Sequence, residues 1–394
     1  MKKKIAILGS TGSIGKTLIE IIKKDKKNFE IVLLSAEVNY KELLNQAKLF
    51  NVKNLIITNK DSYKKIKKDK YSKKIKIFDN FKNYNKIFKN KIDYTMSSIT
   101  GIQGLEPTVD IIKYSKKIAI ANKESIICGW DLIEKKLNKH KTQFIPVDSE
   151  HFSIWYALRN INKNLIEKIY ITASGGPFLN KSLIKLKKVN IKEAIKHPNW
   201  KMGKKISIDS ATLINKVFEV IEAKKIFNLN LNQFEILLHP DSYVHAIVKF
   251  KNGLTKILIH DTDMKIPIFN SIYLNEKKPY KSNSLNFTKI NNFNFKKINP
   301  KQFTAINILK NFKQDQNTLY ETVLVSANDE LVNLFLKKKI SFSDISKKLI
   351  MIINLKEFTK LKSIKPLNFN QIFNLNEHVR LKTKSLCVRS RHNV

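Results

Sequence analysis

The stretch "KKIAILGSTGSIGKTLIEII", residues 3–22, decides the fold. Gly9, Gly12 and Gly15 follow a short apolar run and stand three residues apart, which indicates a tight turn between a first strand and a first helix. Such a turn lets backbone N–H groups approach a pyrophosphate, and the helix N-terminus adds partial positive charge. The common fingerprint is G-x-G-x-x-G, so a plain turn without a ligand is the alternative. Its place after the first strand favours a dinucleotide site.

Working outward, short apolar segments alternate with helix-length segments over residues 1–148. This alternation predicts an α/β fold with a parallel, doubly wound sheet of the Rossmann type. The expected strands are Ile5–Leu8, Glu30–Leu34, Asn54–Ile57, Tyr94–Ser98, Ile118–Ala121 and Gln143–Pro146. We therefore expect a dinucleotide-binding domain over residues 1–148.

The pattern changes after residue 148. Two helical stretches, Phe152–Leu158 and Ser210–Phe227, accompany four expected strands: Glu167–Thr172, Phe234–Leu238, Ala246–Phe250 and Thr255–His260. We expect a central α+β domain over residues 149–277. Residues 278–302, rich in Lys, Asn, Ser and Pro, predict a linker, and residues 303–394 show the period of a helical bundle.

The chain is strongly basic, with 74 Lys and Arg against 33 Asp and Glu, a formal charge of +41. A nucleic-acid-binding protein is one interpretation. However, only four of the basic residues are arginine, the side chain that favours bidentate base and phosphate recognition. The lysines are also spread along the whole chain, so we expect solvated faces and no specific nucleic-acid partner. The positive field would still attract anionic substrates.

The cysteine content and the lack of long apolar runs indicate the cellular compartment of the protein. Two cysteines, Cys128 and Cys387, cannot form a disulfide framework, which is typical of a reducing compartment. No apolar run approaches the ~18 residues of a membrane span, and the run Ile5–Leu8 is too short for a signal peptide. We expect a cytoplasmic protein without a membrane partner.

The end of the second expected strand bears on the nucleotide. An acidic residue about twenty positions after the glycines usually binds the ribose 2′-hydroxyl and favours NAD. Glu37 stands at about that place, provided that the strand ends where the pattern suggests.

Two carboxylates stand close together in "IPVDSEH", residues 145–151. In an extended segment, positions i and i+2 face the same way, so Asp148 and Glu150 could chelate one cation. Carboxylate oxygens suit hard ions such as Mg²⁺ or Mn²⁺. A solvated surface pair is the alternative.

A polar helix face follows in "SIDSATLINKVFEV", residues 207–220. Asp209 or Ser210 is expected to cap a helix. Asn215, Lys216 and Glu219 then share one face, because three and four residues separate them. An amide, a cation and a carboxylate suit a phosphate beside a metal, whereas an ordinary polar face is the alternative.

Two further segments have the composition of binding loops. "TASGGPF", residues 172–178, could hold a phosphate through Ser174 and backbone N–H groups, or form a plain turn. "KHPNWKMGKKI", residues 196–206, could form an active-site lid, or Trp200 could simply be packed. His239 and His245 are expected to be structural.

Taken together, these blocks resemble the 1-deoxy-D-xylulose-5-phosphate reductoisomerase family. The blocks that carry the resemblance are "GSTGSIG", "ANKES", "PVDSEH", "SGGPF", "HPNWKMGKKISIDSATLINK" with Glu219, and "LHPDSYVHAIV". The resemblance spans essentially the whole chain and is densest over residues 94–265. It implies NADPH- and metal-dependent conversion of the phosphorylated sugar 1-deoxy-D-xylulose 5-phosphate to 2-C-methyl-D-erythritol 4-phosphate, in non-mevalonate isoprenoid biosynthesis. It also implies Mg²⁺, Mn²⁺ or Co²⁺, a homodimer, and inhibition by the phosphonate fosmidomycin.

The resemblance further implies roles for single residues. Asp148, Glu150 and Glu219 match the metal ligands. The matches to catalytic and substrate-binding residues are Lys123, Ser149, Glu150, Ser174, His197, Trp200, Met202, Ser210, Asn215, Lys216 and Glu219. The expected NADP(H) contacts are Thr11, Gly12, Ser13, Ile14, Glu37, Val38, Asn39, Asn122, Glu124 and Gly203. By the same resemblance, residues 149–277 are expected to form the catalytic and dimerisation domain. The loop that carries Trp200 and Met202 is expected to be its lid.

One departure from the family pattern concerns the cofactor. Ala36-Glu37-Val38-Asn39 stands where members commonly have a small or basic pair, as in "AGKN". A carboxylate near a 2′-phosphate is repulsive. Either the affinity for NADPH is weakened, or Glu37 points away and lysines such as Lys41 compensate.

Two other functions stay open from the sequence alone. Another NAD(P)-dependent oxidoreductase of similar layout would lack skeletal rearrangement with strict metal dependence. A basic nucleic-acid-binding protein would show sequence-selective binding that resists salt.

Overall fold

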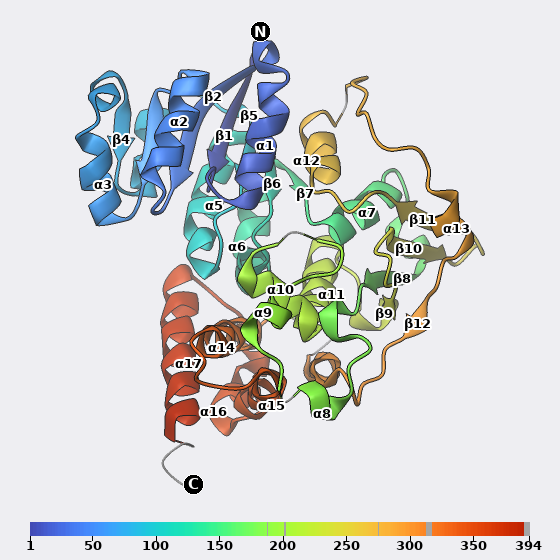
Figure 1. Ribbon diagram of the computed structural model, residues 1–394. Coiled ribbons are helices and arrows are strands. Elements are labelled where there is room, and N and C mark those ends of the chain that lie inside the picture. The colour runs from blue at the N-terminus through green and yellow to red at the C-terminus, as the bar shows by residue number, and fades with distance from the viewer. Residues whose placement is uncertain (187, 201, 275, 313–316, 390–394) are drawn as a thin grey trace. The chain divides into compact units, whose positions relative to one another are not determined.

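The structure is a computed structural model that describes residues 1–186, 188–200, 202–274, 276–312 and 317–389 (Figure 1). The chain divides into two compact units. The first unit comprises Met1–Ser125, Leu132–Phe152 and Met264–Lys281, and the second comprises Ile126–Asp131, Ser153–Asp263 and Ser282–Val394. The four-part division predicted above, with boundaries at residues 148, 277 and 302, stays a prediction.

The first unit is built on a seven-stranded parallel sheet in the described residues, with the order β4-β3-β2-β1-β5-β6-β7. Its strands are β1 (Lys3–Leu8), β2 (Phe29–Ala36), β3 (Asn54–Ile57), β4 (Lys76–Phe78), β5 (Ile92–Ser97), β6 (Ser115–Ile120) and β7 (Gln143–Pro146). Side chains of both strand faces are buried, as a sheet covered on both sides requires. The predicted doubly wound α/β fold is confirmed. Within this sheet, as described, only the short edge strand β4 has no counterpart among the expected strands, because its three residues lie in a lysine-rich segment without clear alternation.

The order of strands reverses at β1, and this reversal creates a binding position. The connections from β1 run outward through β2 and β3, whereas β5, β6 and β7 run the other way. Because parallel crossovers are right-handed, helices of the two halves cover opposite faces. These helices are α1 (Ser13–Lys23), α2 (Tyr40–Phe50), α3 (Lys60–Lys67), α4 (Tyr84–Ile87), α5 (Leu105–Ile111) and α6 (Lys123–His140). Ligands of such sheets bind outside the carboxyl ends of the strands at the reversal, here β1 and β5.

A late segment of the chain completes the first unit. Helix α12 (Lys265–Ile272) lies beside α1 (Figure 1) and buries Ile268, Phe269 and Ile272 in the core of the parallel sheet. Polar contacts anchor the same segment, since the Tyr273 hydroxyl donates to Asp25 at 2.7 Å and Lys278 pairs with that carboxylate.

The second unit contains a mixed sheet of five strands in the described residues, ordered β11-β10-β8-β9-β12. The strands are β8 (Ile166–Ala173), β9 (Phe234–Leu238), β10 (Val244–Phe250), β11 (Thr255–Ile259) and β12 (Lys296–Lys297). Strands β8 and β9 are parallel, and the other pairs are antiparallel. Apolar side chains of α7 (Ser149–Ala157) and α11 (Ile214–Phe227) pack on this sheet and form a second core.

The helical stretch predicted over Ser210–Phe227 is in fact two helices. Helix α10 (Lys204–Ala211) ends before Leu213, which has φ 60°, and α11 begins at Ile214. The prediction that Asp209 or Ser210 caps a helix is therefore wrong, because both lie in the last turn of α10. Apolar periodicity continues across the break, so the pattern alone hides it.

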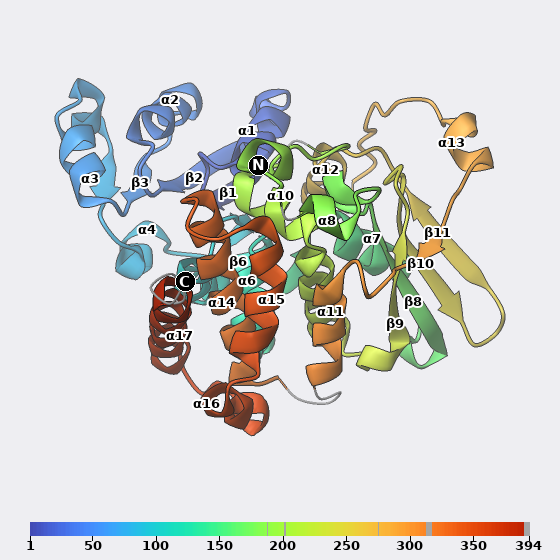
Figure 2. The ribbon, with the colours of Figure 1, turned by 60° about the horizontal axis from the view of Figure 1, so that its bottom comes forward.

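The C-terminal part is helical, as predicted. Helices α14 (Leu319–Leu336), α15 (Phe342–Ile353) and α17 (Phe369–Arg389) lie side by side (Figure 2), with the single turn α16 (Lys356–Thr359) between the last two. Residues 278–302 carry the short elements α13 (Phe287–Asn291) and β12, and α8 (Leu183–Leu186) and α9 (Ile191–Ala194) precede α10. In the part of the chain that the structure describes, no helix has the length and apolarity to cross a membrane.

Candidate active site

The glycine turn is shaped by close backbone approaches. Gly9 has φ 79°, and a Cβ there would lie 2.7 Å from the Ser98 carbonyl oxygen, beyond the end of β5. A Cβ on Gly15 would lie 2.5 Å from the Gly9 carbonyl oxygen. Only glycine fits at either place, because these neighbours are backbone atoms that cannot rotate away. The turn therefore brings α1 close to β1 at the reversal of the sheet, where a pyrophosphate would bind.

The predicted cofactor residues at this turn lie at the start of α1. Gly12 is the residue before the helix, and Ser13 and Ile14 open it. Gly12 and Ser13 are exposed, whereas Thr11 and Ile14 are half-buried. Backbone N–H groups in this first helical turn are thus available to an anion.

Asn122 organises the loops at the ends of β5 and β6. Its amide donates to the carbonyl oxygens of Ile99 and Gly101, the latter at 2.7 Å, and its Oδ1 accepts from the Ser125 N–H at 2.6 Å. Asn122 thereby caps α6, whose first residues are Lys123 and Glu124. These hydrogen bonds use the amide for loop geometry, so its expected cofactor contact stays a prediction.

The segment expected to meet the 2′ position begins where β2 ends. Glu37, Val38 and Asn39 are all exposed, and Asn39 Oδ1 accepts from the Glu42 N–H at 3.2 Å to cap α2. The Glu37 backbone oxygen accepts from the Asn59 N–H at 3.1 Å, which fixes the backbone at this exposed residue.

Asp148 lies between a lysine and a histidine at the start of α7. Lys123 Nζ pairs with its Oδ2, and His151 Nδ1 lies 3.2 Å from its Oδ1. Burial raises the pKa of the Asp148 carboxyl, but Lys123 and His151 outweigh burial and hold that pKa well below its usual range. Asp148 is thus ionised, as a metal ligand must be. His151 was not among the expected site residues, although it stands next to the carboxylate pair in the sequence.

Glu150 reaches Asp148 by a different geometry from the one predicted. The segment is not extended, because α7 begins at Ser149; the Glu150 N–H instead donates to Asp148 Oδ1 at 3.3 Å. The Ser149 hydroxyl donates to the Glu150 carboxylate. A turn into a helix therefore brings the two carboxylates together.

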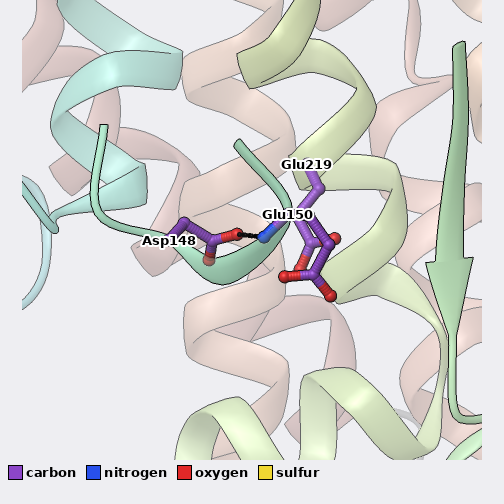
Figure 3. A group of neighbouring side chains, drawn as sticks. All are labelled: Asp148, Glu150 and Glu219. Carbon is purple, nitrogen blue, oxygen red and sulfur yellow. Dashed lines mark hydrogen bonds between the residues drawn. The ribbon is translucent and has the colours of Figure 1, made fainter. Parts of the chain in front are cut away.

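Glu219 shares a helix face with Asn215 and Lys216, as the spacing predicted. Lys216 Nζ lies 2.7 Å from one carboxylate oxygen, and the Asn215 amide donates to the other. One oxygen each from Asp148, Glu150 and Glu219 lies within 4.8 Å of the others (Figure 3). Three carboxylates at this separation match the oxygen ligands that a hard divalent cation prefers.

The expected phosphate loop packs directly on the end of α10. Gly175 and Gly176 have φ 81° and 65°, and a Cβ on Gly176 would lie 3.0 Å from the Ser210 carbonyl oxygen. The Ser174 hydroxyl accepts from the Gly176 N–H at 3.1 Å. Ser174 and Ser210, 36 residues apart in the sequence, thus lie on two segments that contact each other.

His197 contacts Ser174, and its ring is neutral. Its Nδ1 accepts from the N–H groups of Asn199 and Trp200 at 3.1 and 3.0 Å, so the proton is on Nε2, which donates to the Ser174 hydroxyl at 3.0 Å. Burial, and next the charge of Lys216, lower the pKa of His197 to about 4.

The loop expected to form a lid is anchored at its centre. The Asn199 amide donates to the Pro240 carbonyl and the Ser242 hydroxyl at 2.6 and 2.9 Å. The Trp200 ring lies edge-on to His245 with centroids 6.1 Å apart. His245, expected to be structural, therefore neighbours the expected lid, a relation that no local pattern signals. Met202 is half-buried and Gly203 exposed, and Lys201 lies outside the described residues.

A Rossmann-type sheet, a carboxylate trio and a backbone loop suited to phosphate define a class: an NAD(P)-dependent oxidoreductase for an anionic substrate with a divalent cation. Family models for 1-deoxy-D-xylulose 5-phosphate reductoisomerase match residues 5–129, and models for its C-terminal domains match residues 144–227 and 259–382. The chain is 60% identical over 388 residues to the 1-deoxy-D-xylulose 5-phosphate reductoisomerase of Pelagibacter ubique, covering 98% of this chain and 100% of that protein. The chain belongs to the 1-deoxy-D-xylulose 5-phosphate reductoisomerase family.

More distant relatives agree with this assignment. The reductoisomerase of Wolbachia pipientis subsp. Culex pipiens is 38% identical, covering 87% of this chain and 88% of that protein. A solved reductoisomerase with NADPH, fosmidomycin and magnesium has a TM-score of 0.89 and 29% identity, covering 99% of both chains. The Zymomonas mobilis enzyme with NADPH has a TM-score of 0.86 and 30% identity, covering 98% and 99%. The predicted family, enzyme class and activity in non-mevalonate isoprenoid biosynthesis are confirmed, and the unspecified oxidoreductase is set aside.

Proposed function

We propose that this chain uses NADPH and a divalent cation to rearrange and reduce 1-deoxy-D-xylulose 5-phosphate to 2-C-methyl-D-erythritol 4-phosphate. The observation that carries the proposal is the meeting of Asp148, Glu150 and Glu219 within 4.8 Å. A dinucleotide fold alone serves many dehydrogenases. The carboxylate trio adds what a metal-dependent rearrangement requires.

In this proposal the three carboxylates hold Mg²⁺, Mn²⁺ or Co²⁺. The donor set fits, because Asp148 is kept ionised by Lys123 and His151, and Glu219 is oriented by Asn215 and Lys216. When bound, the cation supplies Lewis-acid activation of the substrate's oxygens and fixes their orientation. Lys123, charged and next to the carboxylates, would stabilise an oxyanion or donate a proton to the substrate.

NADPH would bind at the turn that opens α1. The cradle fits, since Gly9 and Gly15 allow a backbone approach that a Cβ would block. The cofactor supplies the hydride for the reductive step. We assign its contacts to residues 11–14, to Asn122, Glu124 and Gly203, and to Glu37, Val38 and Asn39 near the 2′-phosphate. The exposed Glu37 is free to turn toward solvent, and Lys41 would then offset its charge.

The substrate's phosphate would bind to Ser174, Ser210, Asn215 and Lys216. Support comes from the packing of Gly176 on Ser210 and from the charge of Lys216, felt at His197. Ser149 and His197 would contact the rest of the substrate. Trp200 and Met202 would close over it and exclude water, which protects a reactive aldehyde.

We further propose that the protein is a cytoplasmic homodimer. Strand β11 is an edge of its sheet; Ile257 in this strand is 47% exposed, and Leu254, just before it, is 66% exposed. Edge strands with exposed apolar side chains pair readily with a second chain. Light scattering that gives the mass of one chain would contradict the dimer.

The proposed location rests on the cysteines. Both cysteines are free thiols, which suits the cytoplasm; recovery of the protein from a secreted fraction would contradict that location.

The test is oxidation of NADPH, and in parallel NADH, by the purified protein with 1-deoxy-D-xylulose 5-phosphate, with and without Mg²⁺. We expect oxidation only with the metal, and a preference for NADPH if Glu37 points away from the 2′-phosphate. Glu219→Gln should lower kcat by about a thousandfold, because a metal ligand loses its charge.

Glu222→Gln is the matched control, since Glu222 is a buried glutamate on the same helix outside the proposed site. It should retain turnover within about threefold. Metal-independent oxidation, or near-normal turnover in folded Glu219→Gln, would overturn the metal assignment.

A further inference from the structure

We propose that Asn328, on α14, is a positioning residue for the substrate-phosphate site: its hydrogen bond to Asp209 fixes the last turn of α10 and thereby Ser210. This inference rests on the proposed function, because it assumes that Ser210 contacts the phosphate. The bond itself is short and fully enclosed. Asn328 Nδ2 donates to Asp209 Oδ1 at 2.8 Å across 119 residues of sequence, and both residues are at most 2% exposed.

Asp209 is held from two sides. Its Oδ2 accepts from Lys205 Nζ at 2.9 Å, one helical turn earlier, while Oδ1 accepts from Asn328. Lys205 also lies 3.1 Å from Asp329, and Arg380 Nη2 lies 3.0 Å from Glu330. Ion pairs and hydrogen bonds therefore connect α10 to the C-terminal helices. Among the described residues, Asn328 is the single uncharged side chain that donates to Asp209.

Ser210 follows Asp209 directly, so a fixed Asp209 fixes the position of Ser210. The tolerance is small, because Gly176 packs on Ser210 and Ala211 with no room for a Cβ. Rotation or tilt of the last turn of α10 would move Ser210 relative to Ser174, and the two hydroxyls would no longer converge on one phosphate. Binding groups act together only when their positions are fixed to a fraction of an ångström.

Only one end of the Asn328 amide is satisfied by a hydrogen bond. Among the described residues its carbonyl oxygen is buried without a hydrogen-bond partner, which costs free energy that an apolar side chain would avoid. The contribution of this amide is therefore made by its Nδ2, which donates to a buried carboxylate oxygen of Asp209. The Asn328 amide orients Asp209. The next residue of α10 is Ser210, which is proposed to bind the substrate phosphate.

The experiment is a double-mutant cycle with Asn328→Leu, which keeps the shape and removes the donor, and Ser210→Ala. We expect Asn328→Leu to raise KM for the phosphorylated substrate and the inhibition constant of fosmidomycin about tenfold, with kcat and NADPH affinity within about twofold. Because Asn328 acts through Ser210, the double variant should bind no more weakly than Ser210→Ala alone. The exchange Asp209→Asn with Asn328→Asp reverses donor and acceptor and should restore most of the affinity.

Asn376→Leu is the matched control. Asn376 is a buried asparagine on α17 whose Oδ1 accepts from Ser326 at 2.9 Å, so it shares the folding cost and not the contact with α10. It should leave KM unchanged. Equal loss in the Ser210→Ala background, or loss of kcat without a change in KM, would overturn the proposal. If Asn328→Leu does not fold, Asn328→Ser, too short to reach Asp209, takes its place in the same cycle.

Failure of the proposed function is distinguishable. If Ser210→Ala itself leaves KM and fosmidomycin inhibition unchanged, the phosphate assignment is wrong, whatever Asn328 does. If Ser210→Ala weakens both and Asn328→Leu weakens neither, the phosphate assignment stands and the positioning role is wrong.

Discussion

At the scale of single residues, hydrogen bonding decides the protonation state and the tautomer of His197. His197 accepts two backbone N–H groups at Nδ1 and is half-buried near a lysine, so both geometry and charge favour the neutral ring. A protonated ring would have to break those two hydrogen bonds or place a second charge beside Lys216. The sequence marks His197 as a site residue, but only its partners reveal the tautomer.

This environment predicts a pH dependence of stability. The pKa of His197 is about 4 in the folded state and ~6.5 when unfolded, so the unfolded chain binds the proton more tightly. The contribution is present above pH 6.5 and is lost as the pH falls toward 4. From pH 7 to pH 5 the wild type should lose about 1–2 kcal/mol more than His197→Asn, whose amide oxygen can accept the same N–H groups. Urea unfolding at both pH values measures this, and equal losses would contradict it.

At the scale of elements, the break between α10 and α11 matters more than the helices themselves. Leu213 in the left-handed region separates a helix that presents Ser210 from one that presents Asn215, Lys216 and Glu219. A continuous helix, as the periodicity predicted, would place Ser210 and Lys216 on different faces, since six residues rotate by about 600°. The turn at residues 174–176 packs on the last turn of α10, just before the break.

The tight packing of Gly176 predicts a difference between two glycines. Gly176→Ala should cost about 2–4 kcal/mol and raise KM for the substrate, because its Cβ would lie 2.9 Å from Ala211 Cα. Gly253→Ala is the control: Gly253 also has positive φ, at 87°, but open space around the Cβ, so only the backbone penalty of about 1 kcal/mol applies. Thermal unfolding and KM measure both effects. Similar costs in the two variants would show that the turn has room.

At the scale of the whole molecule, residues far apart in the sequence complete each unit. The segment 264–281 lies between strands β11 and β12 of the second sheet in the chain but packs in the core of the first. Asp25 meets Tyr273 and Lys278 across some 250 residues. Burial raises the pKa of Asp25, but the hydrogen bonds from Lys278 and Tyr273 outweigh burial and lower it.

In the described residues, three ion pairs join the segment 264–281 to the rest of the first unit: Lys3–Glu276, Glu20–Lys265 and Asp25–Lys278. The last two should differ in strength. Asp25→Asn should lower the free energy of unfolding by about 2 kcal/mol, because Asp25 is buried and Lys278 would lose its partner. Glu20→Gln removes the exposed pair with Lys265 and should cost less than about 0.5 kcal/mol. Urea unfolding of both variants compares them directly. A larger effect of Glu20→Gln would show that surface charge, not the buried contact, anchors the segment.

The sequence by itself determined the parallel sheet, the glycine turn, the helical C-terminal part and the chemical identity of the carboxylates and serines. These features depend on local spacing, which a period of two or of 3.6 residues records directly. Only the tertiary structure decided the break at Leu213, the return of α12 to the first core, and the contact of Asn328 with Asp209. An amphipathic helix shows the same pattern whichever core it joins, and a hydrogen bond across 119 residues leaves no periodic signal. Those contacts are selected by packing of the whole chain, so they appear only when it is folded.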